Sequence, residues 1–193
     1  AMSPRGPGAS TARPSRRTAF LLPRRARQAA LRRRSAPVSP SNALLRTFAA
    51  VPPGARVIDL ACGAGRHLDP LARLGFDVWG TEAEVGPARE ALAPTLGADE
   101  ARRRVTTGAP DALGYPDAWA DWAVFAARAD HDLGGALVEA ARVLKPGGWI
   151  WVETARPDDL YTLAEAAGLV TAEEPTEEDG VTHAIFRRPG DVR

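Results

Sequence analysis

The chain has 193 residues, of which 45% are hydrophobic and 25% charged, and its formal net charge is +1. This length allows one domain with a full core but not two, and no apolar run reaches the roughly 20 residues that a membrane-spanning helix needs. The single cysteine, Cys62, excludes an internal disulfide bond and a cysteine-based zinc or iron–sulfur site, and it fits a cytoplasmic, reducing location.

Residues 1–38 differ in composition from the rest of the chain. The first 58 residues hold 12 arginines and no acidic residue, whereas residues 59–193 hold 13 basic and 24 acidic residues, a net charge of −11. Because residues 1–38 have little apolar surface to bury, we interpret them as a disordered extension. Three functional interpretations stay open: an export signal, an organellar transit peptide, and a basic arm that contacts nucleic-acid phosphates.

The pattern changes at Ser39, where a folded domain over 39–189 is expected to begin, followed by a short tail over 190–193. Ser39 as N-cap and Pro40 at the first helical position start a short helix. Strands and helices then alternate, as judged from apolar runs, helical periodicity and turn residues. In chain order we predict a strand over 56–62, a helix over 67–74, a strand over 76–82, a helix over 83–96 and a strand over 103–108.

The second half of the domain continues this alternation. We predict a strand over 120–127, a helix over 133–144, a strand over 149–154, a helix over 158–169 and strands over 169–172 and 181–187. The pattern indicates an α/β fold: a doubly wound, mostly parallel sheet of seven strands with helices on both faces. No helix fits between the last two strands, so we expect them to form an antiparallel hairpin at the edge of the sheet.

The stretch "VIDLACGAGRH", residues 57–67, leads from the first predicted strand through Gly63 and Gly65 into a helix. In doubly wound sheets, ligands bind at the carboxyl ends of the strands beside this turn. Glycine lets the backbone approach a ligand closely, and the helix start offers free N–H groups. The dinucleotide fingerprint G-x-G-x-x-G fails at Leu68, and Asp59 lies within the strand. A dehydrogenase is therefore disfavoured.

This stretch resembles motif I of the class I S-adenosylmethionine-dependent methyltransferases: an apolar pair, Asp, Leu, Gly or Ala, Cys, Gly, any residue, Gly. "TTGAPDALGYPDAWADWAVF", residues 106–125, resembles the family's approach to its fourth strand. "ARVLKPGGWIWVE", residues 141–153, resembles its turn into the fifth strand. The resemblance covers about residues 40–189 and implies a Rossmann-like fold, S-adenosylmethionine as cofactor and S-adenosylhomocysteine as product.

The resemblance implies a role for each residue that matches one of the family's motifs. In the turn that begins at Ala61, Gly63 and Gly65 are expected to approach the methionine part of the cofactor, and Asp59 to orient its ammonium group directly or through water. Glu82 follows Gly63 by 19 residues and ends the second predicted strand. An acid at this spacing can accept hydrogen bonds from ribose hydroxyls.

The expected adenine contacts follow from the same resemblance. Ala83 is expected to lie against the base, with the backbone of Ala109, Pro110 and Asp111 beside it. The family's acid that receives the adenine amino group is replaced here by Ala109, so Asp111 or a backbone carbonyl is expected to serve instead. The backbone at Ala126, where the fourth strand ends, is expected to line the cofactor.

His131, just after the fourth predicted strand, is the candidate general base, since its ordinary pKa of about 6.5 suits proton removal. A structural or merely exposed histidine is the competing interpretation. His67 is a second candidate, whereas His183 is expected to be neutral to function. Cys62 is expected to be a small buried apolar group.

Motifs that the sequence lacks exclude some classes of methyl acceptor. The fourth strand ends in "FAARAD" and lacks the Asn/Asp-Pro-Pro-Tyr/Phe of enzymes that methylate amino groups of nucleobases or glutamine. There is no second cysteine for C5-pyrimidine methylation, and no metal is expected. We therefore expect a small-molecule methyl acceptor. Two alternatives stay open: an RNA methyltransferase that uses residues 1–38, and a non-catalytic module that binds the cofactor.

Overall fold

The computed structural model describes residues 39–190. The predicted extension over 1–38, with its three functional interpretations, lies outside this part, as does all but the first residue of the predicted tail. The helices are α2 (Asn42–Phe48), α3 (Leu68–Arg73), α4 (Gly86–Leu96), α5 (Ala98–Arg104), α6 (Leu133–Val143) and α7 (Leu160–Ala166). The strands are β1 (Arg56–Asp59), β2 (Asp77–Glu82), β3 (Val105–Thr107), β4 (Ala120–Ala127), β5 (Leu144–Thr154), β6 (Val170–Thr171), β7 (Thr176–Glu178) and β8 (Val181–Arg187).

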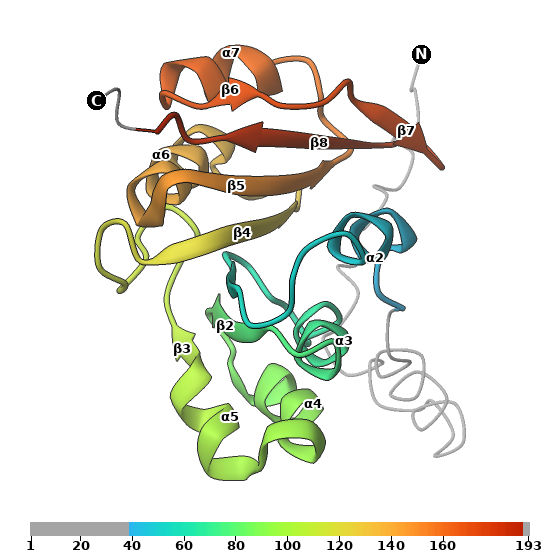
Figure 1. Ribbon diagram of the computed structural model, residues 1–193, viewed down its shortest axis with the longest axis vertical. Coiled ribbons are helices and arrows are strands. Elements are labelled where there is room, and N and C mark those ends of the chain that lie inside the picture. Colours follow the sequence, from blue (N-terminus) through green and yellow to red (C-terminus); the bar gives the residue numbers. More distant parts are fainter. Residues whose placement is uncertain (1–38, 191–193) are drawn as a thin grey trace, which may run out of the picture. The chain divides into compact units, whose positions relative to one another are not determined.

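The strands form one eight-stranded sheet in the order β3-β2-β1-β4-β5-β8-β6, with β7 paired to β8 (Figure 1). The first five strands are parallel, and β8 runs antiparallel to β5, β6 and β7. The predicted fold class is confirmed, including the antiparallel edge. The strand count was one short because β7 lies between the last two predicted strands, in the acidic segment 173–180, where no strand was predicted.

Side chains of the central strands alternate between the two faces of the sheet, as the pleat requires. Ile58 and Phe125 pack beneath α6 and α7. Val57, Val124 and Trp151 pack on the opposite face beneath α2, α3, α4 and α5. Burial on both faces explains why the strands read as continuous apolar runs.

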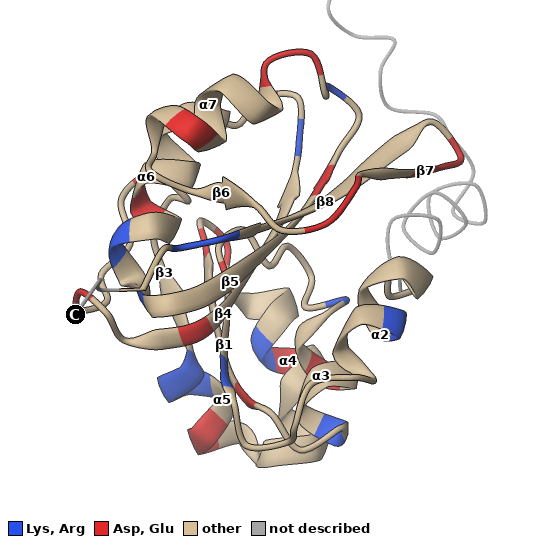
Figure 2. Cartoon of the chain, turned by 45° about the horizontal axis from the view of Figure 1, so that its top comes forward, with Lys and Arg blue, Asp and Glu red and all other residues tan. Residues whose placement is uncertain are grey.

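Two helices differ from the prediction. Ser41, not Ser39, caps α2: its side-chain oxygen accepts the Leu44 N–H at 3.5 Å. Helix α5 was not predicted, because it buries only Ala101 and otherwise presents mostly charged side chains of both signs, which carry no apolar periodicity. Figure 2 shows these positive and negative positions side by side on α5.

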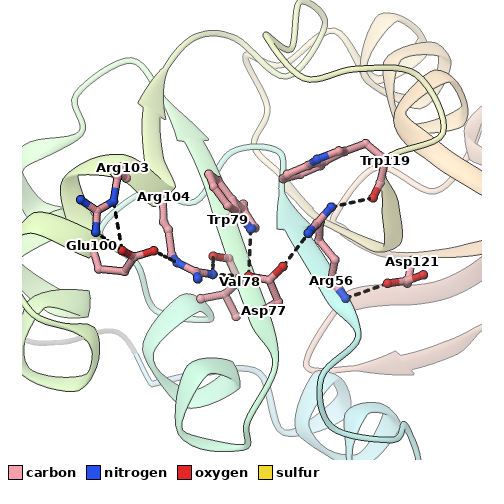
Figure 3. A network of polar contacts seen from close by, with 9 residues as sticks. All are labelled: Arg56, Asp77, Val78, Trp79, Glu100, Arg103, Arg104, Trp119 and Asp121. Atoms are coloured by element: carbon pink, nitrogen blue, oxygen red, sulfur yellow. Dashed lines mark hydrogen bonds and ion pairs between the residues drawn. The ribbon is translucent and has the colours of Figure 1, made fainter.

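A polar network ties the amino ends of three strands together (Figure 3). At the start of β1, the Arg56 backbone N–H donates to Asp121 of β4 at 2.8 Å, and its Nε donates to Asp77 of β2 at 2.8 Å. Arg104 pairs with the other oxygen of Asp77. Partial burial alone would raise the pKa of Asp77, but the hydrogen bonds from Arg56 and Arg104 hold it below its ordinary value of 3.8. These contacts hold the amino ends of β1, β2 and β4 together, whereas ligands are expected at the carboxyl ends of the strands.

Candidate functional site

The turn between β1 and α3 contains two glycines in the left-handed region, Gly63 at φ +56° and Gly65 at φ +80°. A Cβ on Gly65 would lie 3.2 Å from Ala88 Cα and from Ala91 Cβ, so this glycine allows α4 to pack against the turn. A Cβ on Gly63 would meet no atom within 4 Å among the described residues. Gly63 therefore leaves one side of the turn open to a ligand.

Glu82, the last residue of β2, places its carboxylate against this turn. Its Oε2 accepts the Gly63 N–H at 2.8 Å and an Arg128 N–H at 3.3 Å, and its Oε1 accepts the Ala83 N–H at 2.9 Å. Burial by itself would raise the pKa of Glu82, but these hydrogen bonds hold it below its ordinary value of 4.5. The carboxylate is thus ionised at neutral pH, and it keeps lone pairs that can accept hydroxyl groups.

A cavity of about 310 Å³ lies over the carboxyl ends of β1, β2 and β4. This is the position at which doubly wound sheets bind their ligands. The predicted residues that line it are Ala61, Glu82, Ala83, Ala109, Pro110, Asp111 and His131. The remaining lining residues are Leu60, Thr81, Gly108, Arg128, Asp130 and Asp132.

Four predicted residues do not line this cavity: Asp59, Gly63, Gly65 and Ala126. Asp59 is only 1% exposed and lies beneath the turn. Its Oδ1 accepts the Ala61 N–H at 3.3 Å, and its Oδ2 lies 3.7 Å from His67 Nδ1. Ala126 pairs with Glu153 in the ladder between β4 and β5. Asp59 therefore holds the shape of the turn from inside the fold.

His131 lies on the loop after β4 and stacks on Phe125, with ring centroids 5.5 Å apart. Its Nδ1 accepts the Arg128 backbone N–H at 3.2 Å. Partial burial, followed by the charge of Arg128, lowers the pKa of His131 below 6.5, so the ring is neutral at physiological pH. Because Nδ1 is an acceptor here, the proton of the neutral ring lies on Nε2. In this geometry His131 is a hydrogen-bond donor.

Sequence reasoning missed Thr81 and Arg128. Thr81 is 1% exposed, and its Cγ2 would lie 2.7 Å from a Cβ at Gly108, so only glycine fits at that position without a shift. Arg128 contacts Glu82 at 3.3 Å and Asp130 at 3.7 Å. The signal for Arg128 was its position just past the carboxyl end of a parallel strand, where ligand-binding residues gather.

Cys62 is buried, and burial raises the pKa of its thiol, so it stays protonated and serves as a small core residue. Between residues 39 and 190, no cluster of three His, Cys, Asp or Glu side chains is arranged to hold a metal ion. None of the described helices has the length and apolar character needed to cross a membrane.

Residues 58–152 match the family model of a methyltransferase domain. Among solved structures, a TehB-like SAM-dependent methyltransferase from Corynebacterium glutamicum is 20% identical, with a TM-score of 0.63 over 85% of this chain and 95% of that chain. The 1,6-didemethyltoxoflavin-N1-methyltransferase of Burkholderia thailandensis, solved with 1,6-didemethyltoxoflavin and S-adenosylhomocysteine, is 18% identical, with a TM-score of 0.59 over 74% of each chain. These structures share the fold. No curated protein sequence matches the chain.

A further similar structure comes from a complex in Haloferax volcanii between the Trm112 methyltransferase activator and a methyltransferase. It is 17% identical to this chain, with a TM-score of 0.63 over 87% of this chain and 95% of that chain. At this level of identity the likeness extends to the fold and not to the choice of partner.

Proposed function

We propose that this chain, which belongs to the class I S-adenosylmethionine-dependent methyltransferases, transfers the cofactor's methyl group to a small-molecule acceptor. The placement of Glu82 carries the proposal. Its ionised carboxylate touches the glycine turn and lines the cavity at the carboxyl ends of the strands. A ligand with ribose hydroxyls beside a group that rests on the turn fits this arrangement.

The residues in and around the cavity fit the cofactor part by part. Glu82 accepts the ribose hydroxyls, and Ala83 with the backbone of Ala109, Pro110 and Asp111 takes the adenine. The open side of Gly63 receives the methionine end. Below it, Asp59 and Gly65 keep the turn in shape against α4, whereas Ala126 lies in the ladder between β4 and β5 and does not line the cavity.

Bound in this way, S-adenosylmethionine supplies a methyl group that is already activated on a sulfonium. The chain's own contribution is to hold donor and acceptor in line, which can supply most of the acceleration. No nucleophilic side chain is needed, in keeping with the protonated thiol of Cys62. We place the reaction in the cytoplasm, where a single reduced cysteine is usual.

A small molecule is favoured as the acceptor over RNA. Residues 59–193 carry a net charge of −11, which repels phosphates. The RNA interpretation depends on residues 1–38, which lie outside the described part of the chain. An experiment that compares RNA with small molecules as methyl acceptors must decide between the two interpretations.

Isothermal titration of the full chain with S-adenosylmethionine, S-adenosylhomocysteine and NAD tests the cofactor class. We expect both sulfur nucleosides to bind and NAD not to bind. Glu82→Ala should weaken their binding by about tenfold to a hundredfold, because charge-assisted hydrogen bonds worth about 1–3 kcal/mol are lost. Glu90→Ala, an exposed acid on α4, is the matched control. Equal affinity of the Glu82 variant and the native chain would refute the ribose role.

Methyl transfer to a panel of metabolites, compared with transfer to total RNA, tests the acceptor class. Incorporation of methyl groups into metabolites but not into RNA is the expected result. Incorporation into RNA alone would replace the small-molecule proposal with the RNA alternative.

A further inference from the structure

The carboxylate of Glu82 has little hydrogen-bonding capacity left for a ribose. Each of its oxygens can accept about two hydrogen bonds. Among the described residues, Oε2 accepts two, from the Gly63 N–H at 2.8 Å and from an Arg128 N–H at 3.3 Å. Oε1 accepts one, from the Ala83 N–H at 2.9 Å. Oε1 can therefore take one ribose hydroxyl, and the second hydroxyl needs a position on Oε2 that is already in use.

Arg128 is the donor on Oε2 that can give way. The Gly63 N–H belongs to the backbone of the turn, whereas Arg128 donates from the end of a long side chain. That side chain is 51% exposed and the side chain of Glu82 only 11%, so Arg128 is the outer partner of the pair. An ion pair with one partner this exposed contributes little to stability, so its loss costs the fold little. A ribose hydroxyl can therefore replace the guanidinium on Oε2.

A second carboxylate lies within reach of the displaced guanidinium. Arg128 Nε is 3.7 Å from Asp130 Oδ1, two residues further along the loop after β4. Both Glu82 and Asp130 line the same cavity as Arg128. The arginine thus contacts two acids, one at the end of β2 and one on its own loop. When a ribose takes Glu82, the guanidinium keeps Asp130 as its partner.

The main chain at Arg128 is held in place, so only its side chain has to turn. The preceding residue, Ala127, pairs with Thr154 in the ladder between β4 and β5. The Arg128 backbone N–H donates to His131 Nδ1 at 3.2 Å, and its carbonyl oxygen accepts an Arg156 N–H at 3.2 Å. Arg156 donates to the His131 carbonyl oxygen as well, also at 3.2 Å. Displacement of the guanidinium therefore needs a change in side-chain torsion angles and no movement of the loop.

We propose that Arg128 competes with the cofactor's ribose for Glu82, that nucleoside binding turns its guanidinium towards Asp130, and that its return limits how tightly the product is held. This rests on the proposed function, in which the ribose hydroxyls bind Glu82. S-adenosylmethionine and S-adenosylhomocysteine carry the same ribose, so the competition weakens the binding of both. After methyl transfer, the ion pair re-forms as S-adenosylhomocysteine leaves, which favours product release.

Arg128→Met removes the guanidinium and keeps an unbranched side chain. Isothermal titration of the full chain with S-adenosylhomocysteine should show binding about threefold tighter than that of the native chain, the worth of one exposed ion pair. S-adenosylhomocysteine has no net charge, because its ammonium and carboxylate balance. Loss of a positive charge near the cavity therefore does not by itself produce this gain. Equal or weaker binding by the variant would overturn the competition and leave the proposed function standing.

Two further substitutions control for charge and for the identity of the cation. Arg128→Lys keeps a cation that can pair with Glu82 and should bind within about twofold of the native chain. Arg102→Met makes the same change in charge on α5, which contributes no lining residue to the cavity, and should leave the affinity unchanged. An equal gain in Arg102→Met would refute the local competition. If the native chain and every variant failed to bind S-adenosylhomocysteine, the proposed function would fall and this inference with it.

The 2′,3′-dideoxy analogue of S-adenosylhomocysteine tests the competition for lone pairs. This analogue has no ribose hydroxyl, so it does not need the position on Oε2 that Arg128 uses. Ligand-observed NMR should show the same affinity for the analogue in the native chain and in Arg128→Met. An equal gain for the analogue and for S-adenosylhomocysteine would mean that the guanidinium only fills space in the cavity, and would refute the competition for Oε2.

A double-mutant cycle tests whether the gain depends on the carboxylate. Glu82→Gln removes the ion pair, so adding Arg128→Met to this variant should not tighten S-adenosylhomocysteine binding further. In the native background the same substitution should tighten it about threefold. A threefold gain that persists in the Glu82→Gln background would place the effect of Arg128 elsewhere and overturn the proposal.

Discussion

The neutral ring of His131 offers Nε2–H as a hydrogen-bond donor toward a ligand, and this role can be separated from that of a general base. His131→Gln keeps a donor and should retain activity within about threefold, whereas His131→Ala should lose about tenfold, the worth of one hydrogen bond. If activity needs the neutral ring, it should rise as the pH increases through the His131 pKa, which lies below 6.5, and it should be constant around neutral pH. Loss of activity in both variants, together with loss of that acidic limb in kcat/KM, would restore the base role.

Gly108 offers a second test at the scale of one residue. Its replacement by alanine would place a Cβ 2.7 Å from Thr81 Cγ2, beside the cavity at the end of β2. We expect Gly108→Ala to lower the free energy of unfolding by about 1–3 kcal/mol through overpacking and to weaken cofactor binding. Gly114→Ala is the matched control, since a Cβ there meets no described atom within 4 Å. Urea denaturation of both variants gives the comparison, and equal effects would refute the steric reason.

At the scale of elements, the network at the amino ends of β1, β2 and β4 should set stability. Asp77→Asn is expected to lower the free energy of unfolding at neutral pH by about 1–2 kcal/mol, because Arg56 and Arg104 lose a shared partner. The exposed pair of Asp99 and Arg102 provides the control: Asp99→Asn should change stability by less than about 0.5 kcal/mol.

The pH dependence of this loss follows from the lowered pKa of Asp77. A carboxyl group whose pKa is lower in the folded state contributes stability above its ordinary pKa of 3.8, and that contribution disappears as the pH falls through the folded-state value. The difference between the native chain and Asp77→Asn should therefore shrink in acid. Thermal unfolding at several pH values measures it, and a difference that grows in acid would contradict the argument.

The buried strands and long apolar helices could be predicted from the sequence, because burial on both faces imposes a continuous apolar pattern. Short exposed elements could not. Strand β7 is three exposed residues, Thr176–Glu178, whose place depends on pairing with β8. Strand β5 begins at Leu144, earlier than the predicted 149, because the "KPGG" segment joins the ladder with β4 through an irregular register.

The candidate site and its surroundings also contain features that could be predicted from the sequence and features that could not. The glycine turn could be predicted from one continuous motif, residues 57–67, and the position of Glu82 at the end of β2 from its spacing of 19 residues after Gly63. The contact between His183 and a carboxylate could not be predicted, since nothing near His183 in sequence points to it. Its carboxylate partner, Glu153, is 30 residues away and meets it only through the antiparallel register of β5 and β8. Such pairings depend on tertiary structure, which local patterns do not contain.

At the scale of the whole molecule, cofactor binding should stabilise the fold. The cavity draws its lining from the end of β2 and from the loops that follow β1, β2, β3 and β4, so unfolding must destroy it. S-adenosylhomocysteine at a hundredfold excess over its Kd should add about 2.7 kcal/mol to the free energy of unfolding. Glu82→Ala at the same concentration should gain less, and NAD should add nothing. Differential scanning fluorimetry should show this stabilisation as a rise in Tm, and an equal rise in Tm with NAD would contradict it.

The position of β8 has a consequence for how the protein is made. Among the strands of residues 39–190, β8 is the last in chain order to leave the ribosome, yet it lies between β5 and β6 in the finished sheet. Until it emerges, a nascent chain presents the long edge of β5 with free peptide groups, a template for unwanted strand addition. A chain cut short before residue 181 would therefore keep this edge exposed and be prone to aggregate, although every strand from β1 to β5 would be present.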